Sequence, residues 1–346
     1  MSTDQHTEQP TERPAPQLGQ TVHSGQTAQL GQTAQLGQTA QLGQHPGATH
    51  LVVHLSDTHF LAEAAPLYGS LDTDSTVIRA LGQIERLGLL PDALVVTGDI
   101  ADRGESDAYH RIRGLVETAA ARWGSAVVWV MGNHDDRAAF RAELLGQPVS
   151  REAALHPVNT PPAPVDSVIT VNGLRLIALD TSVPGYHHGE LTAVQLDWLA
   201  QELRQPAAHG TILALHHPPI ATPIGLMTVL ELREQQRLAR VVAGSDIRSI
   251  LGGHLHYSTH GLFAGIPVSV AAATCYTMDL TAPHRELTGV NGGQSLNLVY
   301  VYDGQVVHSQ VPIGDFPAVS HFDDGFLARI EALSPAGRLD AFSRQR

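Results

Sequence analysis

Five short apolar runs, rich in Val, Ile and Leu, recur along this chain, and each is followed at once by polar residues. The runs are LVVHLS (51–56), ALVVTG (93–98), AVVWVMG (126–132), TILAL (211–215) and RSILGG (248–253). Runs of this length and composition predict buried strands. Because open α/β folds place their sites at the carboxyl ends of strands, we expect the residues after these runs to gather along one edge of a sheet.

The residues that follow the five runs are of the types that bind metal ions. One Asp-x-His or His-x-His fragment arises easily by chance, but a full ordered set, with each fragment after an apolar run, indicates a single site. The seven predicted metal ligands are Asp57, His59, Asp99, Asn133, His216, His254 and His256. Gly98, Gly132 and Gly253 directly precede three of them and permit close approach of the backbone.

The composition of this ligand set favours Fe or Mn, with Zn also possible, over Ca²⁺ or Mg²⁺, because it combines four His with two Asp and one Asn. Asp99 is the natural bridge, since one carboxylate can reach two ions held about 3.5–4 Å apart. Two divalent ions and two carboxylates leave a local charge of about +2, which attracts phosphate. The sequence therefore predicts a binuclear centre at which a metal-bridging hydroxide attacks a phosphate ester.

Three residues beside the ligands are candidates for further roles in catalysis. His134 follows Asn133 and is placed either to steady phosphoryl oxygens or to protonate the departing alkoxide. We expect the Asp102 carboxylate to orient the His134 imidazole. Arg103 either contacts phosphate or forms only a solvated ion pair with its neighbour.

The remaining histidines are expected to have lesser roles. His54, His110 and His308 are assigned to packing or solvent. His187, His188 and His217 could border the pocket, and we do not expect them to bind metal.

Charge and composition exclude several other classes of protein. The formal net charge of −13 argues against binding duplex nucleic acid, which needs clustered Lys and Arg. Cys275 is the single cysteine, so no intrachain disulfide can form, and its apolar surroundings predict a packed thiol. The first residues lack the pattern of a secretory signal, and no apolar stretch approaches about 18 residues. We therefore expect a cytoplasmic protein without a membrane span.

The chain divides into three parts by composition. Residues 1–48 carry the hexapeptide TAQLGQ three times and predict a disordered, low-complexity tail. Residues 49–314 alternate strand and helix signals and are expected to form the catalytic domain. Residues 315–346 are expected to be a partly disordered tail, with a short amphipathic segment near 325–333.

Helix and hairpin signals together predict the fold class. The expected helices span 74–87, 105–123, 136–145, 192–203 and 228–242. Hairpins are expected around Asn172-Gly173 and Asp303-Gly304. Hairpins would not occur in a purely parallel sheet, so we expect a mixed α/β protein, a four-layer αββα sandwich of two mixed sheets flanked by helices.

At these motifs the chain resembles the calcineurin-like metallophosphoesterases, over roughly residues 51–313. More narrowly, DTSVPGYHHGEL, ILALHHPPI and GHLHYSTHGLFAGIPVSVAAATCYTMDL resemble the bacterial class III cyclic-nucleotide phosphodiesterases, mycobacterial members above all. The TAQLGQ tail and the segment after Gly314 lie outside the resemblance.

The resemblance implies a division of the ligands between two ions. Asp57, His59, Asp99 and His256 would hold the first metal, and Asp99, Asn133, His216 and His254 the second. It further implies an Fe, Mn or mixed centre, hydrolysis of 3′,5′-cyclic AMP to 5′-AMP, and a possible homodimer. The residues expected to face the substrate are His59, Asp99, Asn133, His134, His256 and Arg103.

Other functions stay open on the sequence alone. The ligand set cannot read a nucleobase, so a broader phosphodiesterase or phosphatase, acting on 2′,3′-cyclic nucleotides or other diesters, is an alternative. A non-catalytic scaffold is a further alternative, although scaffolds usually lose ligands. A nuclease is disfavoured by the acidic charge balance.

Overall fold

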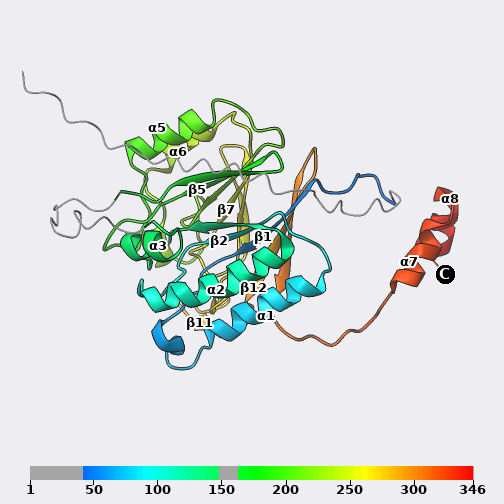
Figure 1. Ribbon diagram of the computed structural model, residues 1–346, viewed down its shortest axis with the longest axis horizontal. Coiled ribbons are helices and arrows are strands. Elements are labelled where there is room, and N and C mark those ends of the chain that lie inside the picture. Colours follow the sequence, from blue (N-terminus) through cyan, green and yellow to red (C-terminus); the bar gives the residue numbers. More distant parts are fainter. Residues whose placement is uncertain (1–41, 148–162, 346) are drawn as a thin grey trace, which may run out of the picture.

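The computed structural model describes residues 42–147 and 163–345. In this part of the chain two β-sheets face each other, and helices cover both outer faces (Figure 1). Three apolar cores separate the four layers: one lies between the sheets, and one lies under each helical layer. The four-layer αββα sandwich predicted from the sequence is confirmed.

The first sheet has the strand order β13-β12-β1-β2-β3. Its strands are β1 (His50–Leu55), β2 (Ala93–Thr97), β3 (Ala126–Val130), β12 (Ser295–Val301) and β13 (Val306–Pro312). β1, β2 and β3 run parallel, with Leu55 opposite Val96 and Thr97 opposite Val130. This register brings the carboxyl ends of the three strands level with one another.

The second sheet has the order β4-β5-β6-β7-β9-β8. Its strands are β4 (Ser167–Val171), β5 (Leu174–Leu179), β6 (Thr211–Leu215), β7 (Ile247–Gly252), β8 (Thr259–Phe263) and β9 (Ile266–Val270). β5, β6, β7 and β9 are parallel, and β4 and β8 pair antiparallel at the two edges. The β4–β5 and β12–β13 hairpins lie where the sequence predicted them.

One expectation about the strands is wrong. The five ligand-bearing strands do not share one sheet edge, because β1, β2 and β3 belong to the first sheet, whereas β6 and β7 belong to the second. The ligands still meet, since the carboxyl ends of both sets of strands lie at the same end of the sandwich. The five ligand-bearing strands therefore share one end of the two-sheet sandwich and not one edge of a single sheet.

In the described chain, five helices form the outer layers. They are α1 (Thr73–Arg86), α2 (Ser106–Trp123), α3 (Arg137–Glu143), α5 (Ala193–Glu202) and α6 (Gln235–Val242). Three of them, α1, α3 and α5, begin at side-chain caps. Asp72 caps α1 by accepting from Ser75 N, and Thr192 and Gln195 form a capping box at α5. α1 and α2 pack on the first sheet, and α5 and α6 on the second. The first four helices match the predicted ranges to within two residues at each end.

The helix predicted over 228–242 is partly wrong. A 3₁₀ turn, η2 (Met227–Leu230), is followed by a break, and α6 starts only at Gln235. Glu234 adopts a positive φ of 48°, and the Leu230 carbonyl accepts from His254 Nε2 at 3.1 Å. A continuous helix would use that carbonyl for its own hydrogen bond, so the break leaves it available to the His254 ring.

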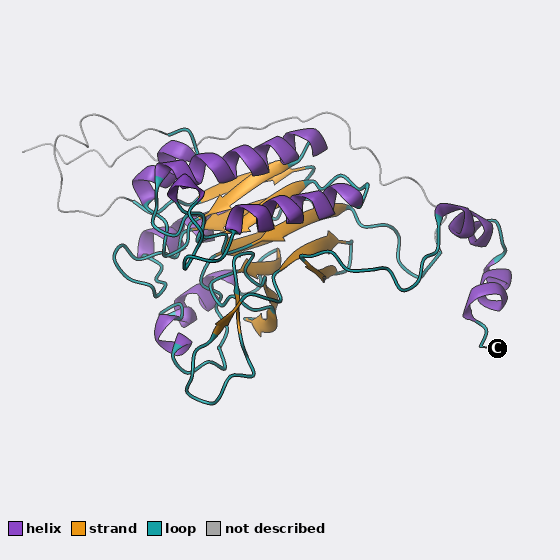
Figure 2. Cartoon of the chain, turned by 90° about the horizontal axis from the view of Figure 1, so that it is seen from below, coloured by secondary structure: helices purple, strands orange, loops and turns teal. Residues whose placement is uncertain are grey.

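Several shorter elements complete the described chain. They are η1 (Ala62–Ala64), β10 (Thr277–Met278), β11 (Gly289–Val290), α7 (Asp324–Glu331), α8 (Pro335–Arg338) and η3 (Leu339–Ser343). α7 and α8 stand apart from the sandwich (Figures 1 and 2), and α7 coincides with the predicted amphipathic segment. Within the described ranges no helix is long and apolar enough to cross a membrane. Most of the predicted N-terminal tail lies outside the described residues.

Candidate metal centre

The first predicted ligand set forms a compact, buried group. Each of its four residues offers one ligand atom, and these atoms lie within 4.8 Å of one another. His59 Nε2 is 3.5 Å from Asp99 Oδ2, and His256 Nε2 is 3.4 Å from Asp57 Oδ1. β1, β2 and the loop after β7 thus converge on one point.

The second predicted set adjoins the first through Asp99. His216 Nε2 lies 3.3 Å from Asp99 Oδ2 and 3.1 Å from Asn133 Oδ1. The His216 and His254 rings are 5.1 Å apart, and ligand atoms of His216, His217 and His254 also lie within 4.8 Å of one another. Asp99 Oδ2 therefore faces both sets, as a bridging carboxylate would.

The four predicted imidazole ligands each have one nitrogen fixed by the protein. The contacts are His59 Nδ1 to Asp102 Oδ1 at 2.9 Å, His216 Nδ1 to the Thr97 carbonyl at 2.8 Å, His254 Nε2 to the Leu230 carbonyl at 3.1 Å, and His256 Nδ1 to the Tyr276 carbonyl at 3.1 Å. Such contacts set the tautomer and leave the other nitrogen as an electron-pair donor. His59 Nε2 is buried without a hydrogen-bond partner. These donors fit two metal ions.

The backbone at the predicted ligands adopts conformations that L-residues rarely take. Five of the seven have a positive φ: Asp57 (50°), His59 (45°), Asp99 (49°), His254 (68°) and His256 (58°). Non-glycine residues in this region are uncommon, and they cluster at functional sites. The strand-end loops therefore store strain where the donors converge.

The glycines before three ligands allow the loops to touch, as the sequence predicted. A Cβ at Gly132 would collide with the backbone nitrogen and carboxylate of Asp99. A Cβ at Gly98 would collide with the His216 ring, and one at Gly253 with Ser56 Oγ. Any side chain at these positions would force the donors apart.

Burial and neighbouring charges give four of these donors, Asp57, Asp99, His254 and His256, the protonation states that metal binding needs. Burial raises the pKa of Asp57 to about 6. Burial acts on Asp99 in the same direction, but the His216 imidazole and its neighbours outweigh it and hold the pKa of Asp99 well below its usual range. Burial lowers the pKa of His254 to about 3 and that of His256 well below its ordinary value. Both rings are thus neutral at pH 7, as ligands must be. Burial also acts to lower the pKa of His216, but the neighbouring carboxylates, Asp99 above all, outweigh it and raise that pKa to about 9, so metal binding there would release a proton.

His134 and Asp102 lie together, but not in the predicted pairing. The Asp102 carboxylate is 2.9 Å from His59 Nδ1 and 3.7 Å from His134 Nδ1. His134 Nδ1 instead donates to the backbone carbonyl of Asp102 at 2.9 Å. The carboxylate therefore orients a predicted metal ligand, and the carbonyl orients His134. Arg103 Nε is 3.6 Å from Asp102 Oδ2, on a side chain that is 73% exposed.

Two residues with a positioning role were missed or undervalued in the sequence. Asp135, the acid that ends GNHD, accepts hydrogen bonds from the backbone of Ile100, Ala101 and Gly132 and from the Tyr109 hydroxyl. It joins the loops that carry Asp99 and Asn133, and its place in the motif was the available signal. His187 Nδ1 accepts from Asn133 Nδ2 at 2.9 Å, which turns the amide oxygen towards His216.

The other two histidines named as pocket neighbours differ from each other. His217 is buried against the site, 2.8 Å from Thr181 Oγ1 and 3.1 Å from the His187 carbonyl. His188 contacts Glu190 at 3.2 Å. Burial lowers the pKa of His217 well below its ordinary value, so its ring is neutral.

A chain of side-chain hydrogen bonds supports Asp57 from between the sheets. His54 Nε2 lies 2.8 Å from Thr97 Oγ1, which donates to Ser56 Oγ at 2.8 Å. Ser56 Oγ donates to Asp57 Oδ2 at 2.5 Å. All of these groups are buried, so the chain acts in a low-dielectric interior, where hydrogen bonds strengthen one another.

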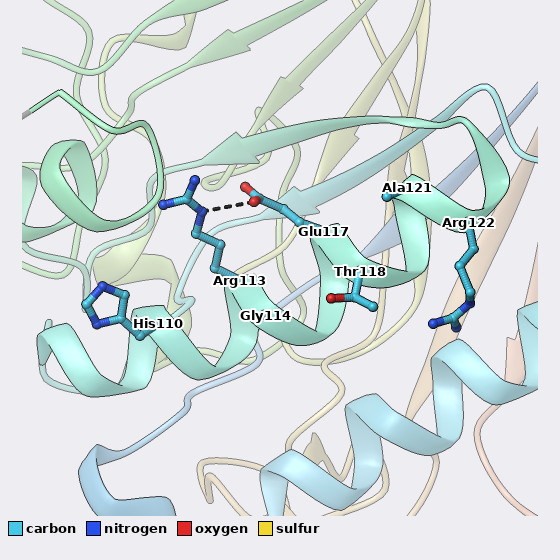
Figure 3. A pocket seen from close by; sticks show the side chains of 7 residues that line it. All are labelled: His110, Arg113, Gly114, Glu117, Thr118, Ala121 and Arg122. Atoms are coloured by element: carbon cyan, nitrogen blue, oxygen red, sulfur yellow. Dashed lines mark hydrogen bonds and ion pairs between the residues drawn. The ribbon is translucent and has the colours of Figure 1, made fainter.

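A separate shallow hollow lies on the exposed face of α2 (Figure 3). It is lined by His110, Arg113, Gly114, Glu117, Thr118, Ala121 and Arg122. Arg113 pairs with Glu117 at 2.9 Å, and His110 pairs with Glu143 at 2.6 Å. The Arg113 and Glu117 charges neutralise one another, and none of the lining residues belongs to a metal-ligating group among the described residues.

A four-layer αββα sandwich with two donor sets that share a carboxylate at its strand ends has the architecture of a metallophosphoesterase. Residues 50–258 match the family of calcineurin-like phosphoesterases. The chain belongs to this family and is a hydrolase of phosphoric esters. The family uses a dinuclear metal centre, and the strand-end cluster provides donors for one.

Individual relatives cover most of the chain. It is 51% identical over 278 residues to the cAMP/cGMP dual specificity phosphodiesterase of Mycobacterium tuberculosis, across 80% of this chain and 84% of that protein. It is 50% identical over 270 residues to a probable cyclic nucleotide phosphodiesterase of Rhodococcus erythropolis, across 78% of this chain and 86% of that protein. A dimetal phosphatase from Danio rerio shares the fold, with a TM-score of 0.53 and 13% identity over 78% of this chain and 98% of that chain.

Proposed function

We propose that this chain hydrolyses 3′,5′-cyclic AMP to 5′-AMP at a binuclear metal centre. The observation that carries the proposal is Asp99, whose Oδ2 lies within 3.5 Å of His59 Nε2 and 3.3 Å of His216 Nε2, between two sets of donors. The names of the two relatives at 50% identity or more support a cyclic nucleotide as the substrate.

The roles of the residues follow from their places in the site. Asp57, His59, Asp99 and His256 would hold one ion, and Asp99, Asn133, His216 and His254 would hold the other. When bound, the two ions withdraw electrons from phosphate and make water acidic enough to attack it at neutral pH. Water adds a hydroxyl group to phosphorus and releases its other proton to solvent, while the bond from phosphorus to O3′ breaks.

His134 supplies the proton that O3′ needs as it leaves. Its side chain is 31% exposed, so it reaches the open side of the site, and the Asp102 carbonyl accepts from Nδ1 and leaves Nε2 for the substrate. Asn133 and Arg103 contact phosphoryl oxygens, and His59, Asp99 and His256 form the floor beneath them.

The test is a substrate panel with defined metals. The full chain loaded with Mn or Fe is expected to hydrolyse cyclic AMP with higher kcat/KM than 2′,3′-cyclic AMP or bis(p-nitrophenyl) phosphate. Asp99→Ala is expected to abolish hydrolysis of all three, whereas exposed Asp197→Ala serves as the unaffected control. Turnover of other diesters without any turnover of cyclic AMP would refute the substrate assignment.

A broad-specificity diesterase is the second candidate, because the predicted metal ligands would act on the phosphate group alone and would not contact a base. It predicts similar kcat/KM for the three substrates. A non-catalytic scaffold is a third candidate, and metal-dependent hydrolysis that disappears in Asp99→Ala would exclude it.

Further parts of the proposal concern the rest of the molecule. We propose Fe, Mn or both as the resident metals, with Zn as an alternative that elemental analysis of the purified protein decides. We also propose a catalytic domain over 49–314 with separate flanking segments 1–48 and 315–346. A cytoplasmic location and a homodimer are proposed as well, and fractionation and sedimentation test them.

A further inference from the structure

Aromatic side chains continue from the metal-ligand cluster to the protein surface. The Tyr276 ring lies 4.5 Å from the His256 ring and 6.5 Å from the His59 ring, measured between centroids. Tyr68 packs edge-on against Tyr276 at 5.5 Å, and the two hydroxyl groups are 3.4 Å apart. Two ring contacts thus connect a predicted metal ligand to Tyr68.

Tyr68 is exposed although its backbone is firmly anchored. Its relative exposure is 74%, whereas the preceding Leu67 is only 2% exposed and packs in a small cluster with Leu61, Ala273 and Cys275. Leu67 and Leu71 exchange two backbone hydrogen bonds, at 2.9 and 3.0 Å. The loop therefore presents one large aromatic ring to solvent from a fixed base.

The conformation of Tyr68 is itself unfavourable. Its φ is 51°, in the left-handed region that bulky residues avoid, and the next residue, Gly69, continues at 74°. Burial does not account for a strained aromatic residue at this position, because most of the Tyr68 side chain is in solvent. Strain of this kind is concentrated at ligand clamps and active sites.

We propose that Tyr68 is the stacking wall of a nucleobase subsite at the lip of the metal centre. This inference rests on the proposed function, because it places the phosphate at Asp99 and His134 and the base against the Tyr68 ring. Tyr276 holds that ring edge-on and contacts His256 with its own ring. Since every base has a π-face, the wall contributes affinity with little preference between adenine and guanine.

The test measures binding by isothermal titration calorimetry with the full chain loaded with Mn. The probes are 5′-AMP and ribose 5-phosphate, which share the phosphate and the sugar and differ in the base. Tyr68→Ala is expected to weaken 5′-AMP by roughly ten-fold to a hundred-fold, the effect of losing one base–aromatic stack. Ribose 5-phosphate should change by less than about two-fold, and Tyr68→Phe should retain the affinity for 5′-AMP.

Phe316→Ala provides the matched control, since Phe316 is a 69% exposed aromatic residue beside Gln83 and Arg86 of α1. The subsite is refuted if Tyr68→Ala leaves 5′-AMP binding unchanged or weakens both probes equally. Failure of the proposed function gives a different result, because wild-type protein would then not hydrolyse cyclic AMP. The dissociation constants of 5′-AMP and ribose 5-phosphate, compared between wild type and Tyr68→Ala, would still show whether the Tyr68 ring binds the base.

Discussion

At the scale of single residues, Asp57 shows how the fold prepares a carboxylate for metal. A chain of hydrogen bonds ends on Asp57 Oδ2. It runs from His54 of β1 to Thr97 of β2 and then to Ser56, the residue between β1 and Asp57. Burial lowers the pKa of His54 to about 3, so the ring is neutral and donates to Thr97 from Nε2. Each donor in the chain points towards Asp57.

Removing the middle of this chain should weaken the metal site. Thr97→Val keeps the shape of the side chain but removes the hydroxyl group, and we expect the affinity for Mn to fall about 10- to 100-fold, as for other groups that orient ligands. Competition with a chelating dye measures the affinity directly. Thr97→Ser, which keeps the hydroxyl group, should restore it. A lower melting temperature with unchanged Mn affinity would show that Thr97 has only a packing role.

Asp166 provides a pH-dependent prediction away from the site. Burial raises its pKa to about 6 from 3.8, although Asp180 N and Gln195 Nε2 donate to its Oδ1 at 2.8 and 3.0 Å. A raised pKa in the folded state stabilises the protein at low pH, and this contribution disappears as pH rises through 6.

Asp166→Asn cannot ionise and keeps the accepting oxygen. Its free energy of unfolding should therefore gain about 1–1.5 kcal/mol relative to wild type between pH 5 and pH 7.5, as linkage requires for this window. Urea denaturation at the two pH values measures the difference. Exposed Asp197→Asn should show no such trend, and a pH-independent difference for Asp166→Asn would contradict the assigned ionisation.

At the scale of elements, Arg248 of β7 joins the two sheets at the end of the sandwich opposite the metal ligands. Its guanidinium group donates to the backbone carbonyls of His209 at 3.2 Å, Asp303 at 3.0 Å and Gln305 at 3.3 Å, and also to that of Tyr302. The carbonyls of 302–305 belong to the β12–β13 turn of the first sheet.

Arg248→Met leaves these carbonyls without their shared donor. We expect the free energy of unfolding to fall by roughly 1–3 kcal/mol, while kcat/KM stays near wild type because the site is at the other end. Urea denaturation and a parallel activity assay measure both quantities. Arg240→Met, on the exposed face of α6, is the matched control. Equal midpoints for the two variants would exclude the role assigned to Arg248.

The elements also show which features the sequence could predict. Local patterns sufficed for the strands before Asp57, Asp99, Asn133, His216 and His254, because an apolar run and the polar residue after it are contiguous. The division of those strands between two sheets depends on pairing between distant segments, which no local pattern encodes. The β8–β9 hairpin, closed by Ala264 and Gly265, was also missed, because its turn lacks the Asn-Gly or Asp-Gly signal.

Within the site, types of residue were predictable and partners were not. The metal ligands could be named from residue type and order in the sequence. In contrast, the sequence does not show that the Asp102 carboxylate contacts His59 and that its backbone carbonyl contacts His134. Similarly, the Leu230 carbonyl before the late start of α6 contacts His254, a contact across 24 residues that helical periodicity cannot indicate.

At the scale of the whole molecule, metal binding should contribute to stability. The predicted ligands come from both sheets, so bound ions would tie the two halves of the sandwich together. Chelation with EDTA is expected to lower the melting temperature by about 5 °C or more, because ligands that bind only the folded state stabilise it by mass action. Differential scanning calorimetry measures the shift. Asp99→Ala should show a much smaller one, and an EDTA effect of the same size in that variant would contradict the shared-ligand arrangement.

The contact of Gly132 with Asp99 restricts how this scaffold can diversify. Loops whose backbones touch cannot be lengthened by one residue or given a bulkier one without separating the donors. We therefore expect variation that changes substrate range in the segments beside the ligands, 183–190 and 220–234, from which His187 contacts Asn133 and Leu230 contacts His254. Libraries that randomise these two segments should yield folded catalysts far more often than libraries that include the interlocked glycines.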